Sequence, residues 1–185
     1  MSNSVITKQA LADALKTCML TKALEKVSIS EICSCCSLNR KSFYYHFRDK
    51  YALVLWIFNQ EIGIEIKEQL DDHATYFLAL NLCTYFEEHR LFYTNALADG
   101  GPGALRDHLV KELQPLVQRT LAIQPHSLMN LEGVSCMVSD FCISALNQWL
   151  RRMPPISAVQ FLDELTSVVI MLTNRVKELL EPTPH

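Results

Sequence analysis

Side chains able to bind phosphates or nucleic-acid bases crowd one short segment of the chain, residues 39–50. Arg and Lys can donate to the edge of guanine, and amide, hydroxyl and phenol groups can bond bases or phosphates. Such a mixture on one helix suits entry into a DNA groove better than burial in an apolar core. For Lys41 the alternative is a merely solvated cation. The candidates to reach bases or adjacent phosphates are Asn39, Arg40, Lys41, Ser42 and Tyr45.

Local signals predict that two short helices, joined by a tight turn, position these side chains. Ser28 followed by Glu31 is a capping-box pattern that can start the first helix. Asn39 is a favoured N-cap for the second helix. Phe43 and Phe47 are four residues apart, so they share one face of the second helix and can be buried together. The pattern therefore predicts a helix-turn-helix whose second helix turns its polar face outward.

The segment 29–53 resembles the DNA-binding signature of the TetR family of bacterial transcription regulators. The likeness rests on Phe-Tyr-Tyr-His-Phe at residues 43–47 with Lys50 and Leu53 behind it, and it covers roughly residues 6–57. The resemblance implies a helix-turn-helix head followed by a helical domain that dimerises and binds an effector. In such regulators a small ligand enters a cavity between the middle helices and changes the spacing of the two heads.

The same resemblance implies roles for further residues of the head. Tyr44, His46 and Lys50 fall where phosphate contacts are usual, and Ser28 or Ser30 can offer a hydroxyl to the DNA backbone. A phosphate beside Lys50 would offset the unfavourable position of a cation in the first turn of a helix. Two alternatives stay open. Tyr44 packs under the first helix instead, or His46 hydrogen-bonds within the head.

The sequence departs from the family pattern at Ser37, where the family usually has Gly in the inter-helix turn. Gly adopts a positive φ without steric cost, and other residues do so at some cost. Either Ser37 has a positive φ or the turn has a different shape.

A closer resemblance points to the branch of this family that regulates dihydroxyacetone-kinase operons. It is carried by residues 39–51, by the Trp-Ile pair at 56–57 and by Asn-Gln-Trp-Leu at 147–150. For such a regulator the trigger can be a partner protein instead of a small ligand, and the regulator can activate instead of repress. The sequence leaves both questions open.

Composition predicts an all-helical protein with two unlike parts. The 185 residues are 49% apolar and include only five Gly, and long periodic apolar stretches dominate. Residues 1–55 carry eight Lys or Arg and four Asp or Glu, a net charge of +4, while the rest carries nine and sixteen, a net of −7. A basic head on an acidic body fits a nucleic-acid-binding module on a body that stays off DNA. We expect a DNA-binding domain at 1–50 and a ligand-binding and dimerisation domain at 51–185.

Helical periodicity and breakers predict the remaining elements. The first helix is expected at 3–24 and the fourth at 49–70, so that the fourth links the head to the body. A Gly- and Pro-rich breaker follows at 99–103, and Pro115 should kink or interrupt the helix around it. The predicted body helices are 76–89, 90–98, 104–123, 131–151 and 157–181.

The last two predicted helices, 131–151 and 157–181, are apolar on more than one side. A monomer of this size would struggle to bury them fully, whereas two copies can pack them as a four-helix bundle. The sequence therefore predicts a homodimer formed through these helices. The alternative is one well-buried helix hairpin inside a monomer.

Seven cysteines, an odd number, are scattered through the predicted helices, a usage typical of reduced thiols. Cys33 and Cys36 have Cys-x-x-Cys spacing, so a metal or redox role must be weighed. No second ligand pair with zinc-site spacing exists, and we expect both to be small packing residues of the second helix. No metal site and no cofactor are predicted.

Several patterns of enzymes and targeted proteins are missing from the sequence. It contains no phosphate-binding Gly-rich loop with Lys-Ser/Thr, no Gly-x-Ser-x-Gly and no His-Glu-x-x-His, so we expect no enzyme. It also contains no apolar run of the roughly 18 residues that a membrane span needs, and its start is too polar for a secretion signal. A cytoplasmic protein without a membrane partner is expected.

These observations converge on a dimeric, sequence-specific regulator that binds operator DNA and whose affinity an effector controls. The alternatives are a switch by a partner protein, a switch by Cys33 and Cys36 chemistry, and an interaction module whose head has lost DNA affinity. For each aromatic residue of the body, core packing competes with a ligand role. The aromatic residues expected to line an effector pocket are Trp56, Phe77, Tyr85, Tyr93, Phe141 and Trp149.

Overall fold

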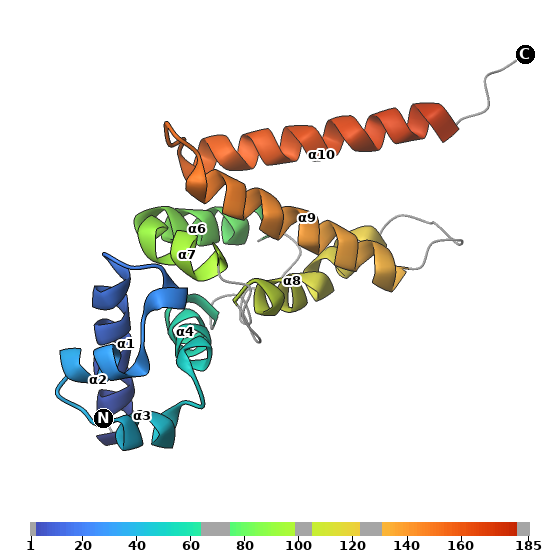
Figure 1. The fold of residues 1–185 in the computed structure, drawn as a ribbon. Helices are drawn as coiled ribbons and strands as arrows, with labels where there is room; N and C mark the ends of the chain where they lie inside the picture. Colours follow the sequence, from blue (N-terminus) through green and yellow to red (C-terminus); the bar gives the residue numbers. More distant parts are fainter. Residues whose placement is uncertain (1–2, 64–74, 99–104, 123–130, 181–185) are drawn as a thin grey trace, which may run out of the picture.

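The computed structural model describes residues 3–63, 75–98, 105–122 and 131–180. Within these ranges the chain forms helices joined by short turns, without any strand, which confirms the all-helical prediction (Figure 1). The predicted breaker at 99–103 and the second half of the predicted helix 49–70 lie outside the described residues.

The N-terminal part of the chain, which we call the head, gathers α1 to α3 and the start of α4 in one corner of the molecule (Figure 1). The sequence predicted the first helix to reach Leu24, and this is wrong. The helix ends at Met19, because Leu24 enters the core from a separate 3-10 turn and is 1% exposed. The elements of the head are α1 (Asn3–Met19), η1 (Leu24–Lys26), α2 (Ile29–Cys35), α3 (Arg40–His46) and α4 (Lys50–Phe58).

The core of the head draws side chains from all four of its helices. Leu11 and Leu15 of α1, Ile32 of α2, Phe43 of α3 and Leu53 of α4 are fully buried together. Burying a side chain of this size contributes roughly 1.5–3 kcal/mol. Because α3 has only seven residues, this apolar anchoring holds it in place more than its own hydrogen bonds do.

The rest of the described chain, which we call the body, begins where α4 passes directly into a π-helical turn. Within the described residues, the predicted helix 49–70 is α-helical from Lys50 to Phe58 and continues as a π-helical turn to Gly63. A Cβ at Gly63 would lie 2.7 Å from Asn59 Oδ1. The elements of the body are η2 (Asn59–Gly63), α6 (Thr75–Glu88), α7 (Arg90–Ala98), α8 (Leu105–Ala122), α9 (Leu131–Arg151) and α10 (Ala158–Leu180).

Pro115 lies inside α8, which continues through it, so the expected interruption does not occur. A proline removes one backbone donor and crowds the preceding turn. Two features offset this cost. The Pro115 side chain faces solvent, and α8 packs against α9 more extensively than any other two described elements pack together.

The turn between α9 and α10 is held by a stack of aromatic rings. Trp149 stacks on Phe161 with ring centroids 4.6 Å apart and planes 8° apart, and its indole N–H donates to the Ile156 carbonyl at 2.9 Å. The Arg90 guanidinium donates to the Trp149 carbonyl at 3.0 Å. These contacts fix the first turns of α10 against the body, and the helix then runs past α9 toward its free end (Figure 1).

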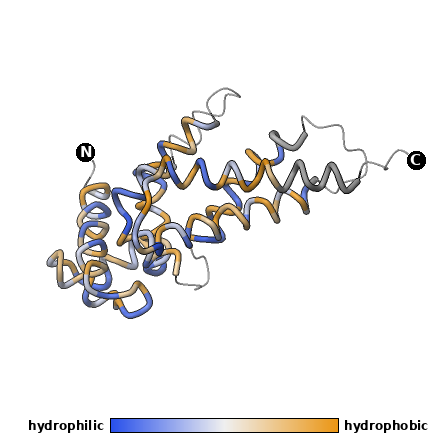
Figure 2. Tube along the Cα trace, turned by 90° about the horizontal axis from the view of Figure 1, so that it is seen from above, coloured by the Kyte–Doolittle hydropathy of each residue, from blue (hydrophilic) through white to orange (hydrophobic). Residues whose placement is uncertain are grey.

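Beyond its anchored start, α10 exposes apolar side chains. Val168, Val169, Ile170 and Met171 are all solvent-exposed, and Met171 retains 63% of its accessible surface. Figure 2 shows hydrophobic residues recurring along the described part of this helix. In the ranges that the structure describes, no helix combines the length with the apolar character that a bilayer crossing demands.

Candidate nucleic-acid interface and effector cavity

The capping box at the start of α2 forms as the sequence predicts. The Ser28 hydroxyl accepts from the Glu31 amide at 3.2 Å, and the Glu31 carboxylate accepts from the Ser28 amide at 2.9 Å. Glu31 also pairs with Lys22, and this partner together with Ser28 lowers the pKa of Glu31 to about 2. Ser28 and Ser30 are exposed at this helix start, and the hydroxyl of Ser28 serves the cap.

The turn between α2 and α3 contains one residue with a left-handed backbone conformation. Ser37 has a φ of 55°, which confirms the positive-φ alternative. The left-handed conformation costs a non-Gly residue roughly 1 kcal/mol. The Leu38 amide donates to the Cys33 carbonyl at 2.9 Å and closes the end of α2. Asn39 then caps α3 by accepting from the Ser42 amide at 2.8 Å, as predicted.

Helix α3 separates its apolar anchors from its polar face. Phe43 and Phe47 are buried, at 0% and 5% exposed, whereas Tyr45 is 84% exposed. Arg40 and Lys41 are also exposed. The helix is therefore fixed by its inner face and offers cations and a phenol on its outer face.

Tyr44 lies between the two faces and carries the Arg40 side chain. It is 49% exposed, and its ring meets Phe43 edge-on at 5.7 Å. The Arg40 guanidinium lies 5.9 Å from the Tyr44 ring centroid and donates to its hydroxyl at 3.5 Å. Such a cation–π contact preorganises the guanidinium without removing it from solvent. His46 is half-buried, and its ring meets the exposed Tyr45 ring edge-on at 4.9 Å.

Lys50 does not point into solvent. Its ammonium donates to the carbonyls of Leu24, Glu25 and Val27 at 2.6, 2.8 and 3.1 Å. A Lys ammonium has three donors, so this arrangement engages all of them. The expected phosphate contact thus has a structural competitor, because Lys50 fastens the start of α4 to the η1 segment. Asp49 caps the same helix by accepting from the Ala52 amide at 2.7 Å.

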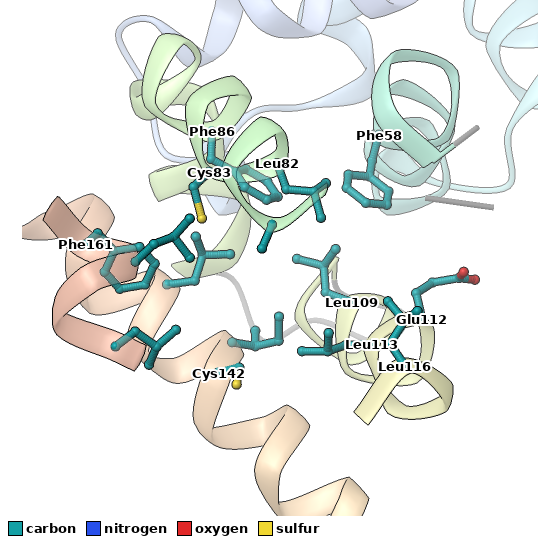
Figure 3. Close-up of a pocket in the computed structure, with 15 residues that line it drawn as sticks. Phe58, Leu82, Cys83, Phe86, Leu109, Glu112, Leu113, Leu116, Cys142 and Phe161 are labelled. Carbon is teal, nitrogen blue, oxygen red and sulfur yellow. The ribbon is translucent and has the colours of Figure 1, made fainter. Parts of the chain in front are cut away.

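The body contains an apolar cavity of about 180 Å³ between α4, α6, α8, α9 and α10 (Figure 3). Its charged lining residue is Glu112, and Figure 3 shows the carboxylate directed away from the cavity centre. The cavity therefore suits an apolar guest. It is lined by Phe58, Ala79, Leu82, Cys83, Phe86, Leu109, Glu112, Leu113, Leu116, Cys142, Ile143, Leu146, Phe161, Leu162 and Leu165.

None of the six aromatic residues expected to line an effector pocket lines this cavity. Trp56 packs edge-on against Phe47 at 6.0 Å, Tyr93 is fully buried, and Trp149 belongs to the stack under α10. These residues are large and apolar, but close packing uses their volume instead of leaving a void beside them. In this structure they pack against other core residues instead of facing into the cavity.

The other three expected pocket residues lie at the surface or in a polar recess. Phe77 and Phe141 are exposed, at 66% and 43%. Tyr85 lines a separate, polar recess together with Glu61 and Glu88, apart from the apolar cavity. The cavity residues that sequence reasoning missed had a detectable signal, since Ala79, Leu82, Cys83 and Phe86 recur at helical spacing along α6. Nothing in that spacing distinguishes a cavity wall from a filled core.

A polar chain of side chains joins the head to the body. Lys16 of α1 forms an ion pair with Glu61, which also accepts from the Tyr85 hydroxyl. The Tyr93 hydroxyl donates to that of Tyr85 at 3.3 Å. Burial raises the pKa of both phenols, and the Glu61 charge adds to both shifts, whereas the hydrogen bond with Tyr85 lowers the pKa of Tyr93. Because Glu61 lies just after α4, a shift of α4 would change the position of Glu61 and so disturb its ion pair with Lys16 of α1.

Cys33 and Cys36 pack within α2. Cys33 is buried, and the Cys36 thiol donates to the Ile32 carbonyl at 3.3 Å. Burial raises the pKa of both thiols. Across the described part of the chain, no three His, Cys, Asp or Glu side chains come together as a metal site requires. This environment favours the packing role over a sensing role for the pair.

Comparison with known proteins begins with the head. Residues 8–57 match the family model described as bacterial regulatory proteins of the tetR family. A curated relative, the HTH-type dhaKLM operon transcriptional activator DhaS of Lactococcus lactis subsp. lactis (strain IL1403), is 30% identical over 93 residues. That alignment covers 50% of this chain and 50% of the relative, so it spans about half the length of each.

Solved structures of similar fold extend over nearly the whole chain. A TetR transcriptional regulator from Streptococcus agalactiae 2603V has a TM-score of 0.71 at 17% identity and covers 90% of this chain and 94% of its own. NalD, the secondary repressor of the MexAB-OprM multidrug efflux pump in Pseudomonas aeruginosa, has 0.67 at 20%, covering 89% and 97%. The dihydroxyacetone kinase operon activator DhaS has 0.59 at 18%, covering 91% and 96%.

The family model matches the segment that builds the head, and the solved structures share the fold of head and body together. The match over residues 8–57 places the head in the tetR family of bacterial regulatory proteins.

Proposed function

We propose that this protein is a sequence-specific, DNA-binding transcription regulator that acts as a homodimer and is controlled by an effector in its body. One observation carries the proposal. Helix α3 is anchored by two buried phenylalanines and turns Arg40, Lys41 and Tyr45 to solvent. A helix of this width and charge fits the major groove of DNA. The DNA-binding domain is residues 1–50, and residues 51–185 form the effector and dimerisation domain.

Within the head, the proposed roles follow from the reach and chemistry of each side chain. Arg40 and Lys41 donate to guanine or to nearby phosphates. Tyr45, with Asn39 and Ser42 at the start of α3, contacts bases or adjacent phosphates. Flanking phosphate contacts come from Tyr44, His46 and the hydroxyls of Ser28 or Ser30. Lys50 contributes charge to the same surface, while its donors hold η1 against α4.

The proposed dimer pairs the last two helices of each copy. Exposed apolar side chains are concentrated on α10, and α9 adds exposed Met137 and Phe141. Leaving this many large apolar groups in water is unfavourable, and a second copy of the same hairpin would bury them. A dimer also presents two α3 helices to successive major grooves on one side of the duplex.

The proposed effector is an apolar small molecule held in the 180 Å³ cavity. Phe58, the last residue of α4, lines that cavity, and Lys50, the first residue of the same helix, is fastened in the head. An effector that displaces Phe58 therefore displaces α4, and the first residues of α4 are packed in the head. It changes DNA affinity only by binding one head spacing better than the other.

A partner protein is the second proposed trigger, as expected for the branch that regulates dihydroxyacetone-kinase operons. The curated relative bears the name of a regulator from that branch. That relative is named a transcriptional activator of the dhaKLM operon and is 30% identical over 93 residues. We therefore include upstream regions of dihydroxyacetone-kinase genes among the first duplexes to be tested, and activation as well as repression among the outcomes. The Cys33 and Cys36 alternative is weaker, because the two thiols pack within α2.

The test is fluorescence anisotropy with a selected duplex and a random duplex, each titrated between about 50 and 200 mM salt. We expect affinity to fall steeply with salt on both duplexes and to be far higher on the selected one. The control variant is Arg152→Ala, which removes a positive charge from an exposed ion pair of the body and should leave DNA affinity unchanged. Binding without salt dependence would contradict the proposal and favour an interaction module.

A further inference from the structure

Two thiols from different helices meet at the junction of α1 and α2. The Sγ atoms of Cys18 and Cys35 lie 3.6 Å apart, although the residues are 17 positions apart in sequence. Cys35 is exposed and Cys18 is partly exposed, so a small reagent in solution can reach the pair. The Lys22–Glu31 ion pair bridges the same two parts of the chain. The junction therefore holds the thiols together by structure rather than by chance proximity along one helix.

The distance between the sulfurs is close to what a covalent bond requires. A disulfide bond is about 2.05 Å long, so the two atoms must approach by roughly 1.5 Å. Cys35 is the last residue of α2, where the chain leaves the helix, and a side-chain rotation with a small shift of that end can supply the movement. Cys36, by comparison, directs its thiol at the carbonyls of Ile32 and Cys33.

We propose that Cys18 and Cys35 form an oxidisable dithiol, which a peroxide converts to a disulfide that ties α1 to α2 and weakens DNA binding. The chemical part stands on the geometry of the thiols alone. The effect on DNA rests on the proposed function.

The reaction balances with hydrogen peroxide as the two-electron oxidant. The exposed Cys35 sulfur attacks the peroxide, the O–O bond breaks, and a sulfenic acid forms with release of one water. The Cys18 sulfur then attacks that sulfenic sulfur, the S–O bond breaks, and the hydroxyl leaves with the Cys18 proton as a second water. Both sulfurs are oxidised and one peroxide is reduced. Burial and the hydrogen bond with Cys35 raise the pKa of Cys18 to about 11, so its sulfur attacks only as its proton passes to the leaving hydroxyl.

The disulfide would affect α3 through the turn that joins α2 to α3. Only Cys36, Ser37, Leu38 and Asn39 separate the end of α2 from the start of α3, and Ser37 is already in a left-handed conformation. A shift of Cys35 therefore moves α3, because so short a turn cannot accommodate the displacement. We expect DNA affinity to fall about tenfold, equivalent to losing roughly one good base contact in the dimer.

Peptide mapping tests the chemistry. The full-length protein is treated with hydrogen peroxide, free thiols are blocked, and a tryptic digest is analysed without reduction. We expect a linked species, two hydrogens lighter than the sum of its parts, joining peptide 17–22 to peptide 27–40. It should vanish in Cys18→Ser and Cys35→Ser, survive in Cys33→Ser and Cys36→Ser, and revert with a dithiol reductant. Absence of this link, or its persistence in Cys35→Ser, overturns the proposal.

DNA binding tests the consequence and separates it from the proposed function. Oxidised wild-type protein should bind the selected duplex about tenfold more weakly than reduced protein, and Cys35→Ser should bind equally in both conditions. Cys136→Ser, which removes an exposed thiol from α9, is the matched control and should behave like wild type. A complete link without any change in affinity overturns the regulatory part. Failure of the reduced protein to bind any duplex would instead count against the proposed function, while the peptide map still decides the dithiol.

Discussion

Replacing Lys50 by Ala is the sharpest test of how the head is built. In the structure the ammonium holds three carbonyls of residues 24–27, and the substitution leaves all three without that donor. A hydrogen bond to a charged group is worth roughly 1.5–3 kcal/mol, but these carbonyls are near enough to water to be partly rehydrated. We therefore expect a loss of about 2 kcal/mol in total, which lowers the melting temperature of a chain this size by about 4–8 °C.

The assay combines thermal unfolding at one fixed protein concentration with DNA titrations well below the transition. A fixed concentration matters because association changes apparent stability. Lys26→Ala is the matched control, since it removes an exposed cation from the same segment, and its stability should stay within about 0.5 kcal/mol of wild type. Lys50→Arg should restore only part of the lost stability, because a planar guanidinium cannot direct three donors at three carbonyls that converge on one point.

The competing role for Lys50 predicts a different pattern. A lysine that only contacts a phosphate leaves stability unchanged when removed and lowers the salt slope of DNA binding by about one. An unchanged melting temperature with such a drop in slope would refute the structural role. A lower melting temperature with an intact salt slope at low temperature would support it.

Three further predictions address the groove contacts, the cap and the cavity. Arg40→Ala should cost about 1–3 kcal/mol on the selected duplex and relax base preference at one position, and equal losses on selected and random duplexes would contradict that. Glu31→Gln should make the free energy of unfolding depend less on pH in the acidic range. The carboxylate has its pKa lowered to about 2 from an ordinary 4.5, so its contribution is complete above about 4.5 and lost as the pH falls toward 2. Urea midpoints across that range, with exposed Glu25→Gln as control, check the sign, and parallel curves for wild type and Glu31→Gln would refute it. Cys142→Phe should fill the cavity and weaken binding of the neutral fluorophore N-phenyl-1-naphthylamine by roughly tenfold or more, whereas Cys136→Phe, on an exposed site of the same helix, should not.

The features that could be predicted from the sequence are those decided within a few residues. Ser28 with Glu31 and Asn39 with Ser42 complete their caps inside one turn, so residue type and spacing suffice. The positive φ of Ser37 was one of two alternatives that the sequence left open, because a tight turn between two fixed helices leaves few backbone conformations.

The features that escaped prediction depend on distant residues meeting. Lys50 lies 23 to 26 positions from the carbonyls it binds, and no local pattern announces that contact. The end of α1 was misplaced because burial of Leu24 outweighs its helix propensity. The cavity was missed because a void is what packing leaves over, and aromatic side chains such as Tyr93 fill space as readily as they border it.

The central claim is that two copies of α3, held apart by a shared helical body, read one face of DNA. Selection from random duplexes followed by hydroxyl-radical footprinting of the preferred duplex tests this most directly. We predict two protected half-sites related by a two-fold axis, with centres about one helical turn (roughly 10 base pairs) apart or slightly more, bound by two chains. A single protected half-site bound by one chain, or a pool without any preferred sequence, would contradict the account.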